Sequence, residues 1–146
     1  MSVSPTGASG AAVSRPVPDE DSADYWAALR DHRILLQQCR RCGETRFPRM
    51  PGCPQCGSEQ FHDVEVRGSG KVYSWIVIHR PLGGLTAEQL PRTIATVELD
   101  EGCRILGRLV NGTAEAADVA ADRPVEAVFV DHDDWTELAF ALIGRP

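Results

Sequence analysis

The sequence predicts a mainly β protein, in which a short N-terminal helix and a metal-binding ribbon precede a five- to six-stranded barrel. Two observations carry this prediction. Four cysteines form two Cys-x2-Cys pairs in the first half of the chain, and such pairs are typical of a ribbon that closes around a metal ion. The second half consists of apolar runs of strand length separated by turn residues. One helix-like stretch among these runs favours an OB-type barrel.

The composition is that of an ordinary globular chain without a membrane span. Its 146 residues are 42% hydrophobic and 25% charged, which suffices for one core and a small appendage. The apolar runs stay far below the roughly 18 residues of a spanning helix, and the start of the chain lacks the pattern of a secretory signal. We therefore expect a cytoplasmic protein with reduced cysteines and no membrane contact. The formal net charge of −6 argues against a large nucleic-acid footprint.

Two segments precede the metal site. Residues 1–18 are rich in Ser, Pro, Gly and Ala, and we expect a disordered tail because they offer no periodic apolar face. Residues 19–33 begin with an acidic, cap-forming stretch, after which Tyr25, Trp26 and Leu29 recur at helical spacing. So short a helix is marginal alone. Its aromatic stripe therefore packs on its own domain or on a partner protein, and the sequence leaves both open.

Residues 34–62 are expected to form a ribbon around one structural Zn2+. The predicted ligands are Cys39, Cys42, Cys53 and Cys56. A glycine follows each pair, which lets the chain turn back so that both sulfurs of the pair face the ion. Four thiolates fill every coordination position of Zn2+, so the metal is expected to hold structure rather than to do chemistry. Two disulfides or a rubredoxin-type iron site are the alternatives, and reduced cysteines favour zinc over disulfides.

Basic residues gather at this ribbon. Six arginines lie between Arg30 and Arg49 against two acids, whereas residues 111–137 hold eight acids against one arginine. Arginines near the ion offset the charge of about −2 on a zinc–tetrathiolate centre. They could also form a phosphate-binding rim, because arginine binds phosphate with two parallel hydrogen bonds. The candidate rim residues are Arg40, Arg41, Arg46 and Arg49.

Residues 63–146 are expected to form the OB-type barrel. The runs of strand length, the first of which leaves the ribbon, are Phe61–Arg67, Lys71–His79, Thr93–Leu99, Cys103–Val110, Val125–Asp131 and Trp135–Ile143. Glycine-containing turns separate several of them, and residues 114–121 have the composition of a short helix. Tyr73 and Trp75 share one strand face. Core packing is the simpler interpretation of that face, and an exposed aromatic platform is the alternative.

At this point the chain resembles a known family. Several motifs agree with it in order: Tyr25-Trp26, Leu36-Gln37-Gln38-Cys39-Arg40-Arg41-Cys42-Gly43, Phe47-Pro48-Arg49, Cys53-Pro54-Gln55-Cys56-Gly57, Gly68-Ser69-Gly70-Lys71-Val72-Tyr73-Ser74-Trp75, Val97-Glu98-Leu99-Asp100-Glu101-Gly102 and Pro124-Val125-Glu126-Ala127-Val128-Phe129. On these motifs, residues 19–145 are similar to the OB-fold proteins with a rubredoxin-like zinc ribbon catalogued as DUF35. Pro91-Arg92 departs from the Pro-Tyr that this family often has before its third strand.

The resemblance implies a companion subunit. Members of this family accompany thiolase-like enzymes or MaoC-type enoyl-CoA hydratases in lipid, sterol and polyketide metabolism, and they usually lack catalytic residues. We therefore expect a non-catalytic subunit that docks on such a condensing enzyme, aldolase or hydratase and helps to bind acyl-CoA. The arginine rim would contact the CoA phosphates. Tyr25, Trp26, Leu29 and Trp75 are the candidate partner interface.

The residues themselves point away from independent catalysis. No nucleophile stands beside a base at a recognisable spacing. Ser69 lies in a structural turn, and Cys103 is expected to be a small buried residue of an apolar strand. Two other functions remain open. The first is a single-stranded nucleic-acid module, which the acids flanking the later strands disfavour, and the second is a standalone acyl-CoA carrier.

Overall fold

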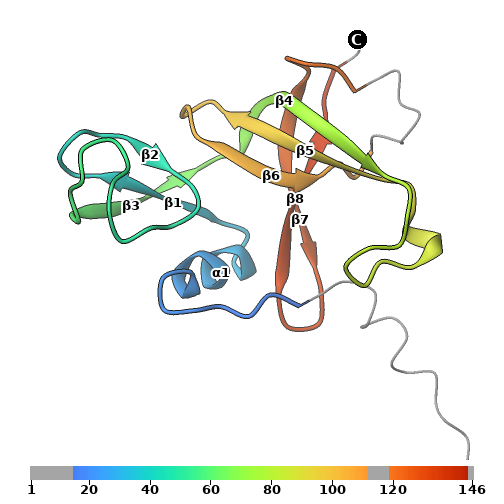
Figure 1. Ribbon diagram of the computed structural model, residues 1–146, viewed down its shortest axis with the longest axis horizontal. Coiled ribbons are helices and arrows are strands. Elements are labelled where there is room, and N and C mark those ends of the chain that lie inside the picture. The colour runs from blue at the N-terminus through green and yellow to red at the C-terminus, as the bar shows by residue number, and fades with distance from the viewer. Residues whose placement is uncertain (1–14, 112–118, 145–146) are drawn as a thin grey trace, which may run out of the picture.

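The computed structural model describes residues 15–111 and 119–144, which form two β-sheets and one α-helix (Figure 1). A small sheet made by the first half of the chain lies at the left of Figure 1, and a five-stranded barrel made by the second half lies beside it. Most of the expected tail and of the expected short helix at 114–121 falls outside the described residues. None of the described helices is long and apolar enough to cross a membrane.

Helix α1 (Ala23–Arg30) is shorter than the segment predicted for it. Before it, the Asp19 carboxylate accepts hydrogen bonds from the backbone N–H and the hydroxyl of Ser22. The helix ends because His32 turns into the left-handed region at φ 56° and its N–H binds the Leu29 carbonyl at 2.9 Å. Tyr25, Ala28 and Leu29 are buried. The aromatic stripe thus packs on its own domain.

The small sheet holds the cysteine-rich segment. It contains β1 (Ile34–Cys39), β2 (Thr45–Arg46) and β3 (Phe61–Val66) in the order β2-β1-β3, with antiparallel pairing throughout. β1 pairs with β3 along its whole length, from Ile34 opposite Val66 to Cys39 opposite Phe61. β1 therefore delivers the first cysteine at its end, while its opposite end is anchored beside the barrel.

The barrel confirms the predicted mainly β, OB-type fold. Its strands are β4 (Ser69–Ile78), β5 (Arg92–Leu99), β6 (Arg104–Arg108), β7 (Pro124–Asp131) and β8 (Thr136–Leu142), in the order β6-β5-β4-β7-β8. A parallel bridge between Leu109 and Phe140 closes it. A 3-10 turn, η2 (Ala87–Gln89), lies in the loop between β4 and β5. Five strands belong to the barrel, because the first predicted run became β3 of the small sheet.

One continuous core joins the helix, the ribbon and the barrel. Phe140, Val72 and Val97 fill the barrel and are fully buried. Leu29 from α1 and Leu36 from β1 belong to the same cluster of buried residues. Alternate residues of β5 point inward, as the strict alternation of its burial shows. The ribbon is therefore fixed to the barrel by packing as well as by the chain.

Strand β4 departs from the prediction after Val72. Val72 lies opposite Val97, but Ser74 lies opposite Thr96, so Tyr73 is an extra residue that shifts the register. β4 pairs with β7 only through Ser69–Lys71. The second half of β4 is therefore hydrogen-bonded along one edge only, to β5. Trp75 keeps 40% of its surface exposed and Tyr73 keeps 52%. The core-packing interpretation of this strand face was therefore wrong.

Candidate metal centre and surrounding surfaces

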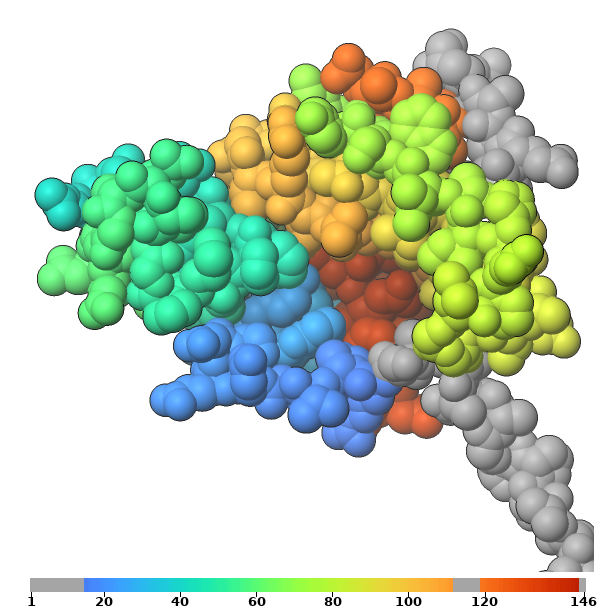
Figure 2. Space-filling model, viewed as in Figure 1, coloured from blue at the N-terminus to red at the C-terminus, as the bar shows by residue number. Residues whose placement is uncertain are grey.

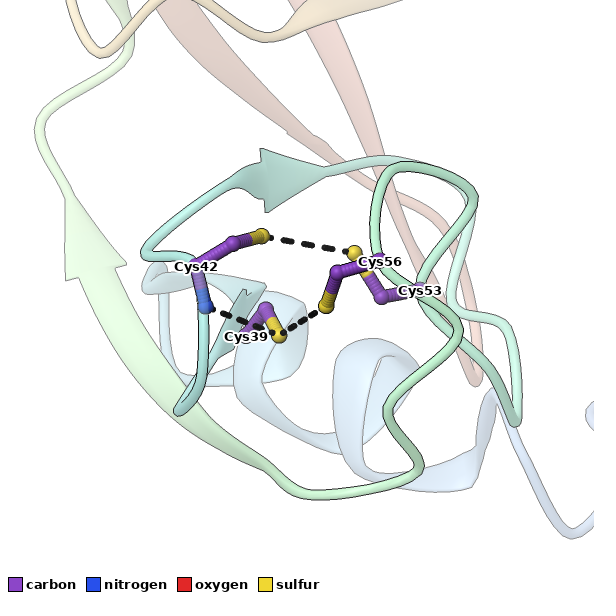
Figure 3. Close-up of side chains that lie close together, drawn as sticks. All are labelled: Cys39, Cys42, Cys53 and Cys56. Carbon is purple, nitrogen blue, oxygen red and sulfur yellow. Dashed lines mark hydrogen bonds between the residues drawn. The ribbon is translucent and has the colours of Figure 1, made fainter.

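The four predicted ligands converge on one point. Their sulfur atoms all lie within 4.8 Å of one another, and two pairs, Cys39 with Cys56 and Cys42 with Cys53, have Sγ atoms 3.6 Å apart (Figure 3). A tetrahedral ion with Zn–S bonds of about 2.3 Å requires sulfurs about 3.8 Å apart. A disulfide would require about 2.05 Å, and all four thiols are free. The arrangement fits one tetrahedral ion.

The two knuckles that carry the cysteines have the same local geometry. Gly43 N–H binds the Cys39 carbonyl at 3.0 Å, and Gly57 N–H binds the Cys53 carbonyl at 2.8 Å. Both glycines have positive φ, at 78° and 76°, a conformation that side chains with a Cβ disfavour. The glycine after each Cys-x2-Cys pair is thus what turns the sulfurs inward.

Backbone N–H groups in the first knuckle prepare a thiolate. The N–H groups of Cys42 and Arg41 point at Cys39 Sγ, at 3.5 and 3.4 Å. Hydrogen bonds to a thiolate favour the charged form, and they lower the pKa of Cys39 to about 6. Thiolate is the form that binds a metal. With four thiolates the coordination of Zn2+ is complete, so the metal has a structural role.

The arginines predicted as a phosphate rim separate into two groups. Arg46 is buried, with Nε 2.8 Å from Gln37 Oε1 and Nη2 3.2 Å from the Met50 carbonyl. The Arg49 side chain is only 7% exposed and pairs with Asp63. Both guanidinium groups are thus engaged in holding the ribbon together.

The other two rim arginines face solvent on the first knuckle. Arg40 and Arg41 are exposed. Arg40 Nε donates a hydrogen bond to the Phe61 carbonyl at 3.1 Å, which ties the side chain to β3 while Arg40 as a whole stays exposed. Both arginines stay close to the cysteines, so they add positive charge at the metal centre as well as at the surface.

The residues predicted as a partner interface do not form one exposed surface. Tyr25 and Leu29 are 6% and 0% exposed. Trp26 is half-buried, with its ring 5.3 Å from Tyr25 and 6.1 Å from Trp135 between centroids. This aromatic cluster joins α1 to the β7–β8 loop. Trp75 lies on β4 of the barrel and is 40% exposed.

Sequence reasoning missed a set of exposed apolar residues. Ile76 and Leu106 keep 62% and 64% of their surface exposed. Leu106 lies between Ile105 and Gly107, which face inward on β6. Both phases of this strand contain apolar residues, so the positions of the apolar residues alone do not say which phase is buried. The alternation of Arg104, Leu106 and Arg108 was the available signal for an outward face.

Cys103 is buried, as predicted, at 5% exposure. Burial, with nearby acidic side chains, raises the pKa of its thiol to about 11. It is therefore a protonated, shielded thiol at neutral pH, unlike Cys39.

Comparison with known proteins gives the family. One matching family model is described as "ChsH2, rubredoxin-like zinc ribbon domain" and covers residues 26–62. A second is described as "ChsH2, C-terminal OB-fold domain" and covers residues 63–130. The two models meet between β3 residues Phe61 and Val66, where the chain passes from ribbon to barrel. The rubredoxin-like ribbon with its clustered sulfurs confirms the structural zinc prediction.

Curated relatives include subunits of CoA-ester enzymes. The 3-oxo-4,17-pregnadiene-20-carboxyl-CoA hydratase alpha subunit of Mycobacterium tuberculosis is 35% identical over 88% of this chain, which spans 40% of that relative. A DUF35 domain-containing scaffold protein of Methanocaldococcus jannaschii is 36% identical over 71% of this chain and 73% of its own. The benzoylsuccinyl-CoA thiolase subunit BbsA of Thauera aromatica is 31% identical over 49% of this chain and 48% of its own.

One chain of a solved structure described as "Ltp2-ChsH2(DUF35) aldolase" resembles this protein over almost its whole length. The TM-score is 0.76 at 35% identity, and the match covers 88% of this chain and 98% of that chain. The described fold, the zinc ribbon and the relatives agree. The chain therefore belongs to the DUF35 family of proteins that join a rubredoxin-like zinc ribbon to an OB-fold.

Proposed function

We propose that this protein is a non-catalytic accessory subunit, which docks on a thiolase-like condensing enzyme, an aldolase or a MaoC-type hydratase. One observation carries the proposal: the chain matches 98% of a chain in the solved structure described as "Ltp2-ChsH2(DUF35) aldolase". The thiolase and hydratase subunits among its relatives support the same role. The substrate class that fits these relatives is an acyl-CoA thioester.

The geometry of this chain supports a role without chemistry of its own. The predicted ion has all four coordination positions filled by cysteine. Cys103 is shielded, with a raised pKa. The barrel interior is occupied by side chains such as Phe140 and Val72, so it offers no binding chamber of the kind that larger barrels enclose. We place the reacting groups on the partner enzyme.

Arg40 and Arg41 are the ribbon residues that we propose contact CoA phosphates. They are exposed and adjacent on the first knuckle, whereas Arg46 and Arg49 are held by Gln37 and Asp63. Guanidinium groups suit phosphate because they donate two parallel hydrogen bonds. The five free cysteines suit a reducing cytoplasm, where we propose the complex works.

The experiment that tests the accessory role is affinity purification of the tagged chain from its native lysate. Mass spectrometry identifies the co-purifying proteins, and a metal assay on the eluate measures zinc. The expected result is one thiolase-like, aldolase-like or hydratase-like enzyme in near-stoichiometric amount. Recovery of the chain alone, or with nucleic acid, would overturn the proposal. If the isolated chain turned over acyl-CoA esters at an enzyme-like rate, the non-catalytic part would be wrong.

A further inference from the structure

The outer face of strands β4, β5 and β6 carries exposed aliphatic side chains at its centre. Ile76 on β4 lies opposite Ile94 on β5, and Leu106 on β6 lies opposite Thr96 on β5. Ile76 and Leu106 are 62% and 64% exposed, and Tyr73 at the bulge of β4 is 52% exposed. Contiguous exposed apolar residues of this kind mark interaction sites rather than ordinary surface.

Basic side chains surround this apolar centre. At one end Arg104 and Lys71 contact the same carboxylate, Glu98, with closest N–O distances of 3.3 and 3.8 Å. At the other end Arg108 pairs with Glu137. Burial and the nearby charge of Arg108 lower the pKa of Arg92. The two arginines lie close together because β5, which carries Arg92, pairs with β6, which carries Arg108. Lys71 also pairs with Asp122, at 3.4 Å. The rim thus carries four cations, Lys71, Arg92, Arg104 and Arg108, against three carboxylates, Glu98, Asp122 and Glu137, in a chain whose net charge is −6.

We propose that this outer β4–β6 face, with Tyr73, Ile76, Ile94 and Leu106 inside a rim of Arg92, Arg104 and Arg108, is the surface that docks the enzyme partner. The inference rests on the accessory role proposed above and specifies where that docking occurs. The complementary surface on the partner is an apolar patch flanked by carboxylates. In Figure 2 the yellow and orange atoms of β5 and β6 lie open between the zinc ribbon at the left and the loop after β4 at the right.

Charge argues against a second copy of this chain as the occupant. A symmetric pair formed through this face would place two arginine rims against each other, because the same surface is used twice. Like charges that face each other across an interface oppose association. An enzyme surface with acidic residues around an apolar patch meets the rim with opposite charge.

The side chains also argue against nucleic acid, although OB barrels commonly bind it on the corresponding strands. Such proteins stack bases on exposed aromatic rings. Here the centre is aliphatic, and the ring of Tyr73 is covered on one side by Arg104, whose Cζ lies 3.6 Å from the ring centroid. Ile76 and Leu106 offer burial to a protein surface and no stacking platform to a base.

The test is quantitative co-purification with three tagged chains: wild type, Leu106→Glu and Leu82→Glu. Leu82 is 63% exposed in the loop between β4 and β5, so its substitution is a matched control outside the face. Because both positions are exposed, each variant is expected to keep its zinc and its melting temperature. We expect Leu106→Glu to reduce the recovered enzyme by about tenfold or more and Leu82→Glu to leave it unchanged.

Other outcomes overturn the proposal in distinguishable ways. Wild-type recovery of the enzyme by Leu106→Glu would remove this face from the interface while the accessory role stands. Absence of any enzyme from the wild-type eluate would remove both. Recovery of nucleic acid that depends on Leu106, or a dimer in light scattering that Leu106→Glu abolishes, would assign the face to those occupants instead. An Arg92→Glu variant tests the rim. If this variant recovered as much enzyme as the wild type in both about 50 mM and about 300 mM salt, the charge argument would be contradicted.

Discussion

Arg108 on β6 and Glu137 on β8 form a two-pronged ion pair, with Nε 3.0 Å from Oε2 and Nη2 3.0 Å from Oε1. The two side chains are 22% and 16% exposed. The pair lies beside the bridge between Leu109 and Phe140, where β6 and β8 close the barrel. It is therefore a polar clasp across the point where the sheet would otherwise have open edges.

Removal of one partner of this pair should destabilise the fold. Arg108→Ala leaves the Glu137 carboxylate largely buried without its guanidinium, so we expect a loss of about 1–3 kcal/mol in the free energy of unfolding. Denaturant titration measures it. Arg33→Ala is the control, because Arg33 and Glu65 are about half exposed at 47% and 55% and such pairs contribute at most about 1 kcal/mol. Equal losses in the two variants would contradict the clasp.

The same pair predicts a pH dependence. Burial by itself raises the pKa of Glu137, but hydrogen bonds and the charge of Arg108 outweigh it and hold the pKa below its ordinary 4.5. The folded state then binds the proton less readily than the unfolded chain, so the stabilisation is complete above about pH 4.5 and is lost as the pH falls through the folded pKa.

Melting temperatures of wild type and Glu137→Gln, measured from about pH 7 down to about pH 3.5, check this dependence. The gap between the two should stay constant in the upper range and shrink at the acid end. Acid release of zinc affects both proteins alike, so the gap reports Glu137 together with its partners Arg108 and His132. A gap that grows with acid would show that the carboxyl is stabilised in its protonated form.

Gly107 is expected to tolerate no side chain. A Cβ at this position would lie 2.6 Å from Cδ2 of Phe140 and 2.7 Å from its Cε2, and Phe140 is completely buried. Gly107→Ala should therefore cost about 1–3 kcal/mol of stability, as overpacking in a core does. Gly52→Ala is the control, since its Cβ would meet nothing within 4 Å. Similar denaturation midpoints for the two variants would refute the close approach.

The sequence was most informative where structure is local. The Cys-x2-Cys-Gly repeats predicted the knuckles because sulfur, turn and glycine lie within five consecutive positions of each other, as in residues 39–43. Alternation predicted β5 for the same reason, since its inward residues, from Thr93 to Leu99, keep one period throughout. The barrel class followed from the number and spacing of such runs.

What the sequence could not supply depends on tertiary contacts. Nothing near Arg46 in the chain says that its guanidinium will be buried against Gln37, whereas Arg40 stays outside. The bulge at Tyr73 is equally invisible, because one extra residue exchanges the inner and outer faces of β4. For this reason the predicted partner interface mixed buried residues of α1 with exposed Trp75.

Arg40 and Arg41 should affect the affinity of the complex for CoA only if the ribbon contacts the CoA phosphates. We expect the double substitution Arg40→Glu and Arg41→Glu to weaken CoA binding by the purified complex about tenfold or more, because two charge-assisted contacts become repulsive. Calorimetry measures the affinity. The control reverses Arg30 and Arg67, which are also exposed but lie away from the knuckles. Unchanged affinity in the first variant would end the phosphate role.

Removal of the metal should unfold the ribbon before the barrel. The segment from Cys39 to Phe61 has few buried side chains apart from Cys39, Arg46 and Cys53, so the free energy of metal binding, on the order of 10–16 kcal/mol in isolated zinc fingers, holds it. We expect a chelator to accelerate hydrogen exchange throughout residues 39–61 and to leave β5 protected, because Ala95 and Val97 lie in the apolar core.

Cys42→Ser should give the same exchange pattern without chelator, whereas Cys103→Ala should retain one zinc per chain. Loss of protection in β5 together with the ribbon would mean that the two fold as a single cooperative unit.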